Sequence, residues 1–133
     1  MADTVDPHAV PSFALSSGAS IPAIGLGTFG SDRFTLDDIA SAVGVAIRTG
    51  YRLIDCASVY ANEPLIGPVI DQTLTETGLS REELFVISKV WNDAHAPEDA
   101  VASVKKSLSD LKLDYLDALL IHWPFPNTHE RFA

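Results

Sequence analysis

Apolar and polar positions change period in a regular order along the chain, which predicts strands and helices in alternation. Residues 13–15 and 21–23 are short apolar segments on either side of SSGAS, and they predict a small hairpin. AIGLGTF, residues 23–29, follows as a short strand whose glycines allow another backbone or a ligand to come close. TLDD, residues 35–38, has the pattern of a capping box, and apolar residues then recur at helical spacing until Gly50 ends this first helix.

A second strand and helix follow. RLIDCA, residues 52–57, predicts the strand, and a helical pattern of apolar residues then continues to a stop near Gly78. Pro68 would remove a backbone donor inside that helix, which favours a helix start near Gly67.

The same order then occurs once more. Residues 80–83 form a capping-type turn ahead of a third strand, LFVISKVW, at 84–91. Pro97 opens a third helix, and LDALLIHW at 116–123 predicts a fourth strand. The apolar stripe of the third helix consists of Val101, Val104, Leu108 and Leu111.

These strands are too uniformly apolar to face water on either side. Such strands occur in parallel sheets covered by helices, and the alternation of strands with helices leads to the same arrangement. The expected fold class is therefore α/β. The 133 residues have room for one domain, which we expect at 13–133 behind a flexible N-terminal arm of residues 1–12.

Charge and composition limit the partners and the compartment. The chain has 9 basic and 18 acidic residues and a formal net charge of -9, so it has no electrostatic footprint for nucleic acid or for anionic lipid. We expect neither nucleic acid nor a membrane as a partner. The N-terminal residues lack the pattern of a secretory signal, and the single cysteine, Cys56, cannot form an internal disulfide, so a cytoplasmic location is expected.

Polar residues interrupt the apolar strands near their carboxyl ends, where parallel α/β folds place ligands. The residues found there are Thr28, Asp55, Lys89 and His122. Each of the last three shares a strand face with an apolar residue two positions earlier. Adjacent strands lie roughly 5 Å apart, so side chains at matched height on equivalent faces can touch. The pattern predicts that three ionisable groups converge.

The segments around these residues carry a family resemblance. GLGTFG at 25–30, GYRLIDCASVYANE at 50–63, LFVISKVWN at 84–92 and LDYLDALLIHWP at 113–124 resemble the N-terminal part of an aldo-keto reductase. The resemblance implies a partial (β/α)8 TIM barrel, in which an N-terminal hairpin precedes about four parallel strands and three main helices. A closed barrel needs about 200 residues or more, so we expect a fragment with little activity alone.

The resemblance implies a catalytic tetrad, which consists of Asp55, Tyr60, Lys89 and His122. Members of the family mostly reduce aldehydes or ketones to alcohols. The implied cofactor is NADP(H), with NADPH preferred, and the implied partner is a small-molecule carbonyl substrate. The residues implied to contact the cofactor are Gly27, Thr28, Phe29 and Asp55. Those implied to contact the substrate are Trp91 and His122.

The tetrad residue types suit this chemistry. When hydride reaches a carbonyl carbon, the oxygen develops charge and must be protonated or held by donors. Tyr60 is the implied proton donor, and a nearby Lys89 ammonium favours its phenolate. Asp55 would hold Lys89 in position, and His122 would orient the carbonyl oxygen or share the proton relay.

Several residues also have simpler interpretations. Trp91 is nearly as well explained as an interfacial core residue, and Trp123 is interpreted as packing. Cys56 is interpreted as a core filler. His95 and His129 lack metal-ligand spacing, so no metal site is predicted. Lys112 stands where the family commonly has glycine, and a lysine in a left-handed helix cap would cost about 1 kcal/mol.

Two other functions stay open. We expect strands one and four to have open edges, so the chain is alternatively a non-enzymatic half-barrel that dimerises or binds a partner through those edges. A weaker rival is a TIM-barrel aldolase that uses Lys89 to form a Schiff base.

Overall fold

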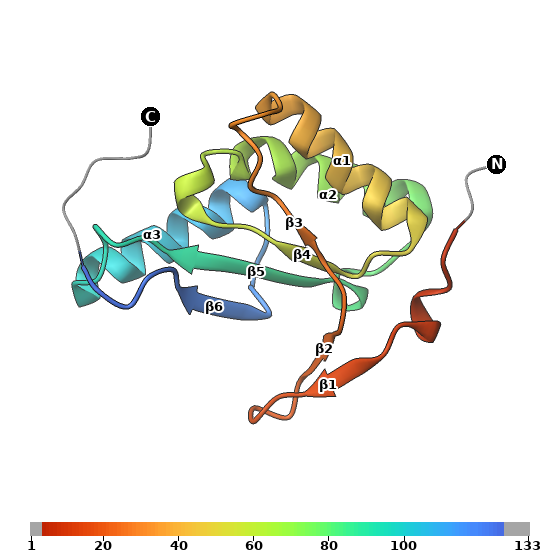
Figure 1. Ribbon diagram of the computed structural model, residues 1–133, viewed down its shortest axis with the longest axis horizontal. Coiled ribbons are helices and arrows are strands. Elements are labelled where there is room, and N and C mark those ends of the chain that lie inside the picture. The colour runs from red at the N-terminus through yellow and green to blue at the C-terminus, as the bar shows by residue number, and fades with distance from the viewer. Residues whose placement is uncertain (1–3, 127–133) are drawn as a thin grey trace.

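A parallel sheet of strand order β3-β4-β5-β6 forms the centre of the computed structural model, which describes residues 4–126 (Figure 1). The strands are β3 (Leu26–Gly27), β4 (Leu53–Asp55), β5 (Phe85–Val90) and β6 (Ala118–Ile121). All neighbouring strands pair in parallel, as the sequence predicts. Figure 1 shows the helices on one side of this sheet and the N-terminal hairpin on the other.

The helices connect successive strands. α1 (Leu36–Thr49) joins β3 to β4, α2 (Glu63–Thr77) joins β4 to β5, and α3 (Pro97–Leu111) joins β5 to β6. The short 3-10 turns of the described residues are η1 (Pro7–Ala9), η2 (Ser58–Tyr60) and η3 (Arg81–Glu83).

Each face of the sheet has its own apolar cluster. Between sheet and helices, the buried residues include Val43, Ile47, Ile54, Ile66, Ile70, Val86 and Leu111. On the other face the cluster is smaller and consists of Leu53, Phe85 and Ile87, with Leu15 and Ile21 packed against it. Burial of apolar area on both faces is the main force that holds the strands in one sheet.

The predicted hairpin is confirmed, about one residue earlier than expected. β1 (Ser12–Ala14) pairs antiparallel with β2 (Ser20–Pro22), and Phe13 lies opposite Ile21. Ahead of it, the Val5 N–H donates to a carbonyl at the end of α1. The flexibility expected of residues 1–12 stays a prediction.

The limits of α1 follow its sequence signals. Thr35 Oγ1 accepts from the Asp38 N–H at 3.1 Å, and Asp38 Oδ2 accepts from the Thr35 N–H at 3.2 Å, which completes the predicted capping box. Gly50 ends the helix with φ 121°. A Cβ there would lie 2.2 Å from the Val5 carbonyl oxygen, so glycine is required for conformation and for space.

The predicted start of α2 near Gly67 is wrong, because the helix begins at Glu63 and contains Pro68. The reason is packing against α3. A Cβ at Gly67 would lie 2.4 Å from the Asp110 carbonyl oxygen, so the two backbones meet here. Burial along this contact offsets the one backbone donor that Pro68 removes.

The first half of α3 and strand β6 are less covered than expected. Val101 of the predicted stripe is 55% exposed, because α3 packs on α2 and β5 and has no further helix beside it in residues 4–126. All of β5 is buried, but Leu119, Leu120 and Ile121 of β6 are exposed. Lys112 caps α3 in the left-handed conformation, with φ 54°, which is the conformation in which a lysine has a steric cost.

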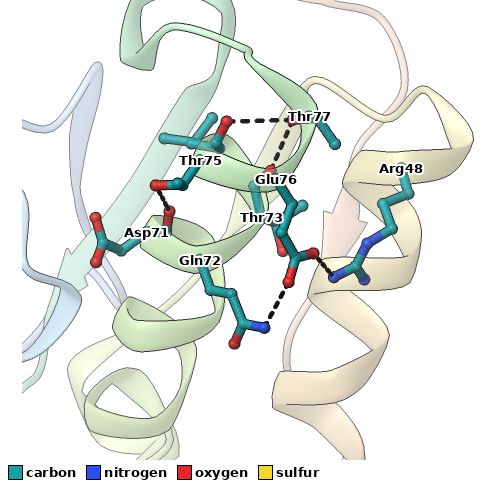
Figure 2. Close-up of polar contacts among 8 residues, drawn as sticks. Arg48, Asp71, Gln72, Thr73, Thr75, Glu76 and Thr77 are labelled. Atoms are coloured by element: carbon teal, nitrogen blue, oxygen red, sulfur yellow. Dashed lines mark hydrogen bonds and ion pairs between the residues drawn. The ribbon is translucent and has the colours of Figure 1, made fainter.

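Polar contacts join α1 to α2 at the surface (Figure 2). Glu76 accepts from Arg48 NH2 at 2.6 Å and from Gln72 Nε2 at 2.5 Å. Thr75 and Thr77 donate back to carbonyls one turn earlier in α2. These groups are largely exposed, so they fix surface geometry more than stability.

Candidate active site

Lys89 and Asp55 form an ion pair at the carboxyl ends of β5 and β4. Lys89 Nζ lies 2.6 Å from Asp55 Oδ1 and also donates to the Cys56 carbonyl oxygen at 2.8 Å. The lysine is 9% exposed, so its charge is nearly enclosed. Water screens such a pair less than it screens a surface pair, which strengthens the attraction.

The sequence pattern predicts the three ionisable residues at matched height along the strands, but their positions are offset. Asp55 pairs with Ile87, and Lys89 pairs with Leu120, so the lysine lies two residues further along than the acid. This offset is roughly 7 Å along the strands. The long lysine side chain spans it, and convergence therefore depends on lysine at this position.

Tyr60 lies beside this pair, in the turn η2 that follows β4. Lys89 Nζ is 5.2 Å from the centroid of the Tyr60 ring. The ring contacts Phe29 at a centroid distance of 5.2 Å and His122 at 5.6 Å, the second edge-on. The structure thus brings together the four residues Asp55, Tyr60, Lys89 and His122.

His122 lies in a ring of aromatic groups. Its imidazole meets Trp91 edge-on at 5.0 Å, and its backbone N–H donates to the Val90 carbonyl oxygen, which extends the pairing of β5 and β6. Burial lowers the pKa of His122 from its ordinary value of 6.5, the nearby Lys89 ammonium lowers it further, and Asp55 opposes this. The imidazole is therefore neutral at neutral pH and can donate one N–H to a ligand.

A cavity of about 570 Å³ opens over Tyr60 and His122, whereas Asp55 and Lys89 lie behind them and do not line it. It is lined by Phe29, Ser31, Asp32, Val59, Tyr60, Trp91, His122 and Trp123. Sequence reasoning missed Val59, Ser31 and Asp32, and it interpreted Trp123 as packing. Their positions in the sequence offered a signal for a place in the cavity wall, because Val59 directly precedes Tyr60 and Trp123 directly follows His122. Trp123 does pack, at 5.2 Å from Trp91, but it also lines the cavity.

The segment of predicted cofactor contacts lies next to Asp55. Thr28 is fully buried, and its N–H and Oγ1 both donate to the Asp55 carbonyl oxygen at 3.0 Å. Gly27 pairs with Asp55 in the sheet, and a Cβ added there would meet nothing within 4 Å. Open surface therefore lies beside Asp55, where a planar group has room.

Cys56 is a core residue, as predicted. It is fully buried in the cluster between sheet and helices. Burial raises the pKa of its thiol to about 12, and the neighbouring Glu63 adds to this. Within residues 4–126 no group of three or more His, Cys, Asp or Glu side chains could hold a metal ion, and His129 lies outside that range. None of the helices in these residues is long and apolar enough to cross a membrane.

The chain is similar to many aldo-keto reductases. The model of the Aldo/keto reductase family matches residues 23–132. Aldo-keto reductase family 1 member A1 of Xenopus tropicalis is 49% identical over 112 residues, which cover 84% of this chain and 33% of the relative. An aldo/keto reductase of Synechocystis is 46% identical over 112 residues, with the same coverage. The chain therefore spans about a third of the length of these relatives.

Solved structures show the same likeness. The Bombyx mori aldo-keto reductase in complex with NADP superposes with a TM-score of 0.85 at 39% identity, covering 92% of this chain and 40% of that one. The aldose reductase of Schistosoma japonicum gives 0.84 at 40% identity, covering 90% and 39%. The sheet and its helices are thus part of a (β/α)8 barrel.

Proposed function

Because this chain belongs to the aldo/keto reductase family, we propose that it carries the proton-transfer site of an NADP(H)-dependent oxidoreductase that reduces aldehydes or ketones to alcohols. The observation that carries the proposal is the Lys89–Asp55 ion pair at 2.6 Å, which lies next to the Tyr60 ring. The Tyr60 ring in turn meets the His122 imidazole edge-on. A mostly aromatic cavity opens over Tyr60 and His122.

The reaction needs a hydride and a proton. When bound, NADPH would supply the hydride to the carbonyl carbon and would become NADP+. The carbonyl oxygen takes the proton of the Tyr60 hydroxyl and leaves as the alcohol, and solvent returns a proton to the phenolate. The Lys89 ammonium stabilises the phenolate in the interval by its charge, and Asp55 keeps that ammonium in place.

His122 orients the carbonyl. Since burial and Lys89 keep the imidazole neutral, it donates a hydrogen bond without competing with Tyr60 as an acid. Trp91 and Trp123 enclose the rest of the substrate by apolar contact. Substrate contact by Trp91 and His122 is thus part of the proposal.

The residues near Asp55 suit the nicotinamide end of the cofactor. Gly27 leaves an open surface there, and Phe29 borders it. Thr28 is buried behind this surface and holds the Asp55 backbone by donating to its carbonyl oxygen. Among residues 4–126 the cavity lining includes no arginine or lysine, so the phosphates of NADP(H) require residues other than these. The preference for NADPH over NADH rests on the family resemblance and on the NADP in the Bombyx mori structure.

The proposed location is the cytoplasm. It rests on the single cysteine, which is buried in the core and has no second cysteine in the chain to pair with.

Tyr60→Phe tests the proposal, with Tyr115→Phe as the matched control. Tyr115 lies over Arg81, away from the cavity. In the native protein that carries this chain, Tyr60→Phe should lower NADPH-dependent reduction of a simple aldehyde roughly 100-fold or more while NADPH binding is retained. Tyr115→Phe should change neither. Full turnover by Tyr60→Phe would reject the assignment.

One observation favours the second candidate, a non-enzymatic half-barrel. Leu119, Leu120 and Ile121 are exposed on β6, at an open sheet edge that can pair with another strand. If this edge binds a second copy, sedimentation of the 133-residue chain should show a dimer that Ile121→Lys converts to monomer. A monomeric wild-type chain would exclude dimerisation through this edge.

The aldolase has less support. An ammonium held at 2.6 Å by a carboxylate is a poor nucleophile for a carbonyl carbon. Borohydride should therefore trap no substrate on Lys89.

A further inference from the structure

Asn62 is the N-cap residue of α2 but does not cap the helix with its side chain. Asparagine at an N-cap ordinarily accepts a hydrogen bond from a backbone N–H of the first turn. Here the side chain makes no such bond, and its Nδ2 donates instead to the Thr28 carbonyl oxygen at 2.8 Å. Asn62 is 1% exposed and Thr28 is fully buried, so the contact is enclosed in the protein.

This contact links the candidate acid to the candidate proton donor. Thr28 holds the Asp55 carbonyl oxygen through two hydrogen bonds, from its N–H and its Oγ1. Asn62 then ties the same residue to the turn that carries Tyr60. The end of β3 therefore fixes Asp55 and Tyr60 relative to each other.

The Tyr60 turn depends on support from outside. Ala61 has φ 57° and ψ 17°, a left-handed conformation that alanine seldom adopts. Inside the turn, the Tyr60 N–H donates to the Ala57 carbonyl oxygen at 3.1 Å and the Ala61 N–H to that of Ser58 at 3.3 Å. Hydrogen bonds of a 3-10 turn have poor geometry, so neighbouring contacts must hold the conformation of this short turn.

Stability alone does not explain the choice of contact. Oδ1 of Asn62 is buried and makes no hydrogen bond to any residue in 4–126, which is a costly state for an acceptor. We propose that Asn62 is a positioning residue, which ties the Tyr60 turn to Thr28 and so keeps the phenol beside the Lys89–Asp55 pair. This inference rests on the proposed role of Tyr60 as proton donor.

Two variants and one control test the proposal in the native protein that carries this chain. Asn62→Ala removes the carboxamide, and Asn62→Asp keeps the volume but loses the donor, so it serves if the first variant does not fold. Asn92→Ala is the control, because Asn92 is also 1% exposed and its side chain makes no hydrogen bond to the described residues. The Asn62 variants should lower kcat roughly tenfold or more and change the Kd of NADPH less than about twofold, and the control should change neither.

A double-mutant cycle shows whether Asn62 acts through Tyr60. If it does, Asn62→Ala should not lower the residual rate of Tyr60→Phe any further. An equal loss in both backgrounds would mean a general structural role and would overturn the proposal. Unchanged kcat in the wild-type background would overturn it too.

Amide hydrogen exchange separates this inference from the proposed function. If the wild-type protein reduces no carbonyl, the proposed function fails, and exchange then decides the positioning claim alone. We expect exchange at Tyr60 and Ala61 to be roughly tenfold faster or more in the Asn62 variants, and unchanged in Asn92→Ala. Unchanged exchange in the Asn62 variants would show that the turn does not depend on this contact.

Discussion

Lys89 reaches back along the sheet to Asp55, and its Nζ lies 2.6 Å from Asp55 Oδ1 although the two residues are not opposite each other in the register. Asp55 pairs with Ile87, so the lysine side chain covers the difference in height. The same Nζ donates to the Cys56 carbonyl oxygen. Two bonds from one ammonium thus fix its position at the ends of the strands.

Asp117 should be important for the stability of the β5–β6 edge. Its Oδ2 accepts from the Val86 N–H at 2.8 Å and from Arg81 NH2 at 2.7 Å, and both side chains of the ion pair are less than one fifth exposed. Asp117→Ala leaves the Val86 N–H without its acceptor and the Arg81 guanidinium without its carboxylate, so we expect the free energy of unfolding to fall by about 2–3 kcal/mol in urea titration.

The matched control is the exposed ion pair of Arg48 and Glu76 shown in Figure 2. Both side chains are more than two fifths exposed, so Arg48→Met should cost less than about 1 kcal/mol. Equal losses for Asp117→Ala and Arg48→Met would contradict the account of the β5–β6 edge.

Lys112→Gly should stabilise the protein. Lys112 has φ 54° and ψ 42° at the end of α3, where glycine has no steric penalty. We expect a gain of about 1 kcal/mol in the free energy of unfolding. Ser109→Gly, inside the same helix, should instead lose about 0.5 kcal/mol. The prediction fails if thermal melting shows Lys112→Gly at or below the wild type.

Glu63 should make stability depend on pH. Its Oε1 accepts from Ser88 Oγ at 2.6 Å, and burial raises the pKa of this carboxyl above its ordinary value of 4.5, against the opposing hydrogen bonds. The folded state then holds its proton to higher pH than the unfolded state does. Its contribution is fully present below the unfolded value and is lost as pH rises through the folded pKa.

Glu63→Gln removes this titration while keeping an acceptor for Ser88. The difference in unfolding free energy between variant and wild type should therefore shift in favour of the variant as pH rises from about 4 to about 8. Denaturant titrations across that range measure it. A difference that stays constant would show that Glu63 has the same pKa in both states.

Local signals predicted the parts of the fold that depend on local structure. The capping box at Thr35 and the end of α1 at Gly50 each depend on a few neighbouring residues. The start of α2 does not, because it depends on the contact of Gly67 with α3. The neighbouring sequence does not show that burial between α2 and α3 offsets the backbone donor lost at Pro68.

The site could be predicted as far as strand ends define it. Asp55, Lys89 and His122 interrupt apolar strands, and the structure places them together with Tyr60. The stepped register could not be seen, because it depends on how whole strands align. The role of Asn62 was hidden as well, since its partner Thr28 is 34 residues away in the chain.

Reduction of a simple aldehyde by NADPH, measured for wild type, Lys89→Met and the control Lys106→Met in the native protein that carries this chain, tests the central claim most directly. Lys106 lies on the exposed side of α3, paired with Asp110, outside the aromatic cavity. The account predicts that Lys89→Met lowers kcat roughly 100-fold or more with NADPH binding retained, and that Lys106→Met is unaffected. Turnover by Lys89→Met equal to that of the wild type would contradict it.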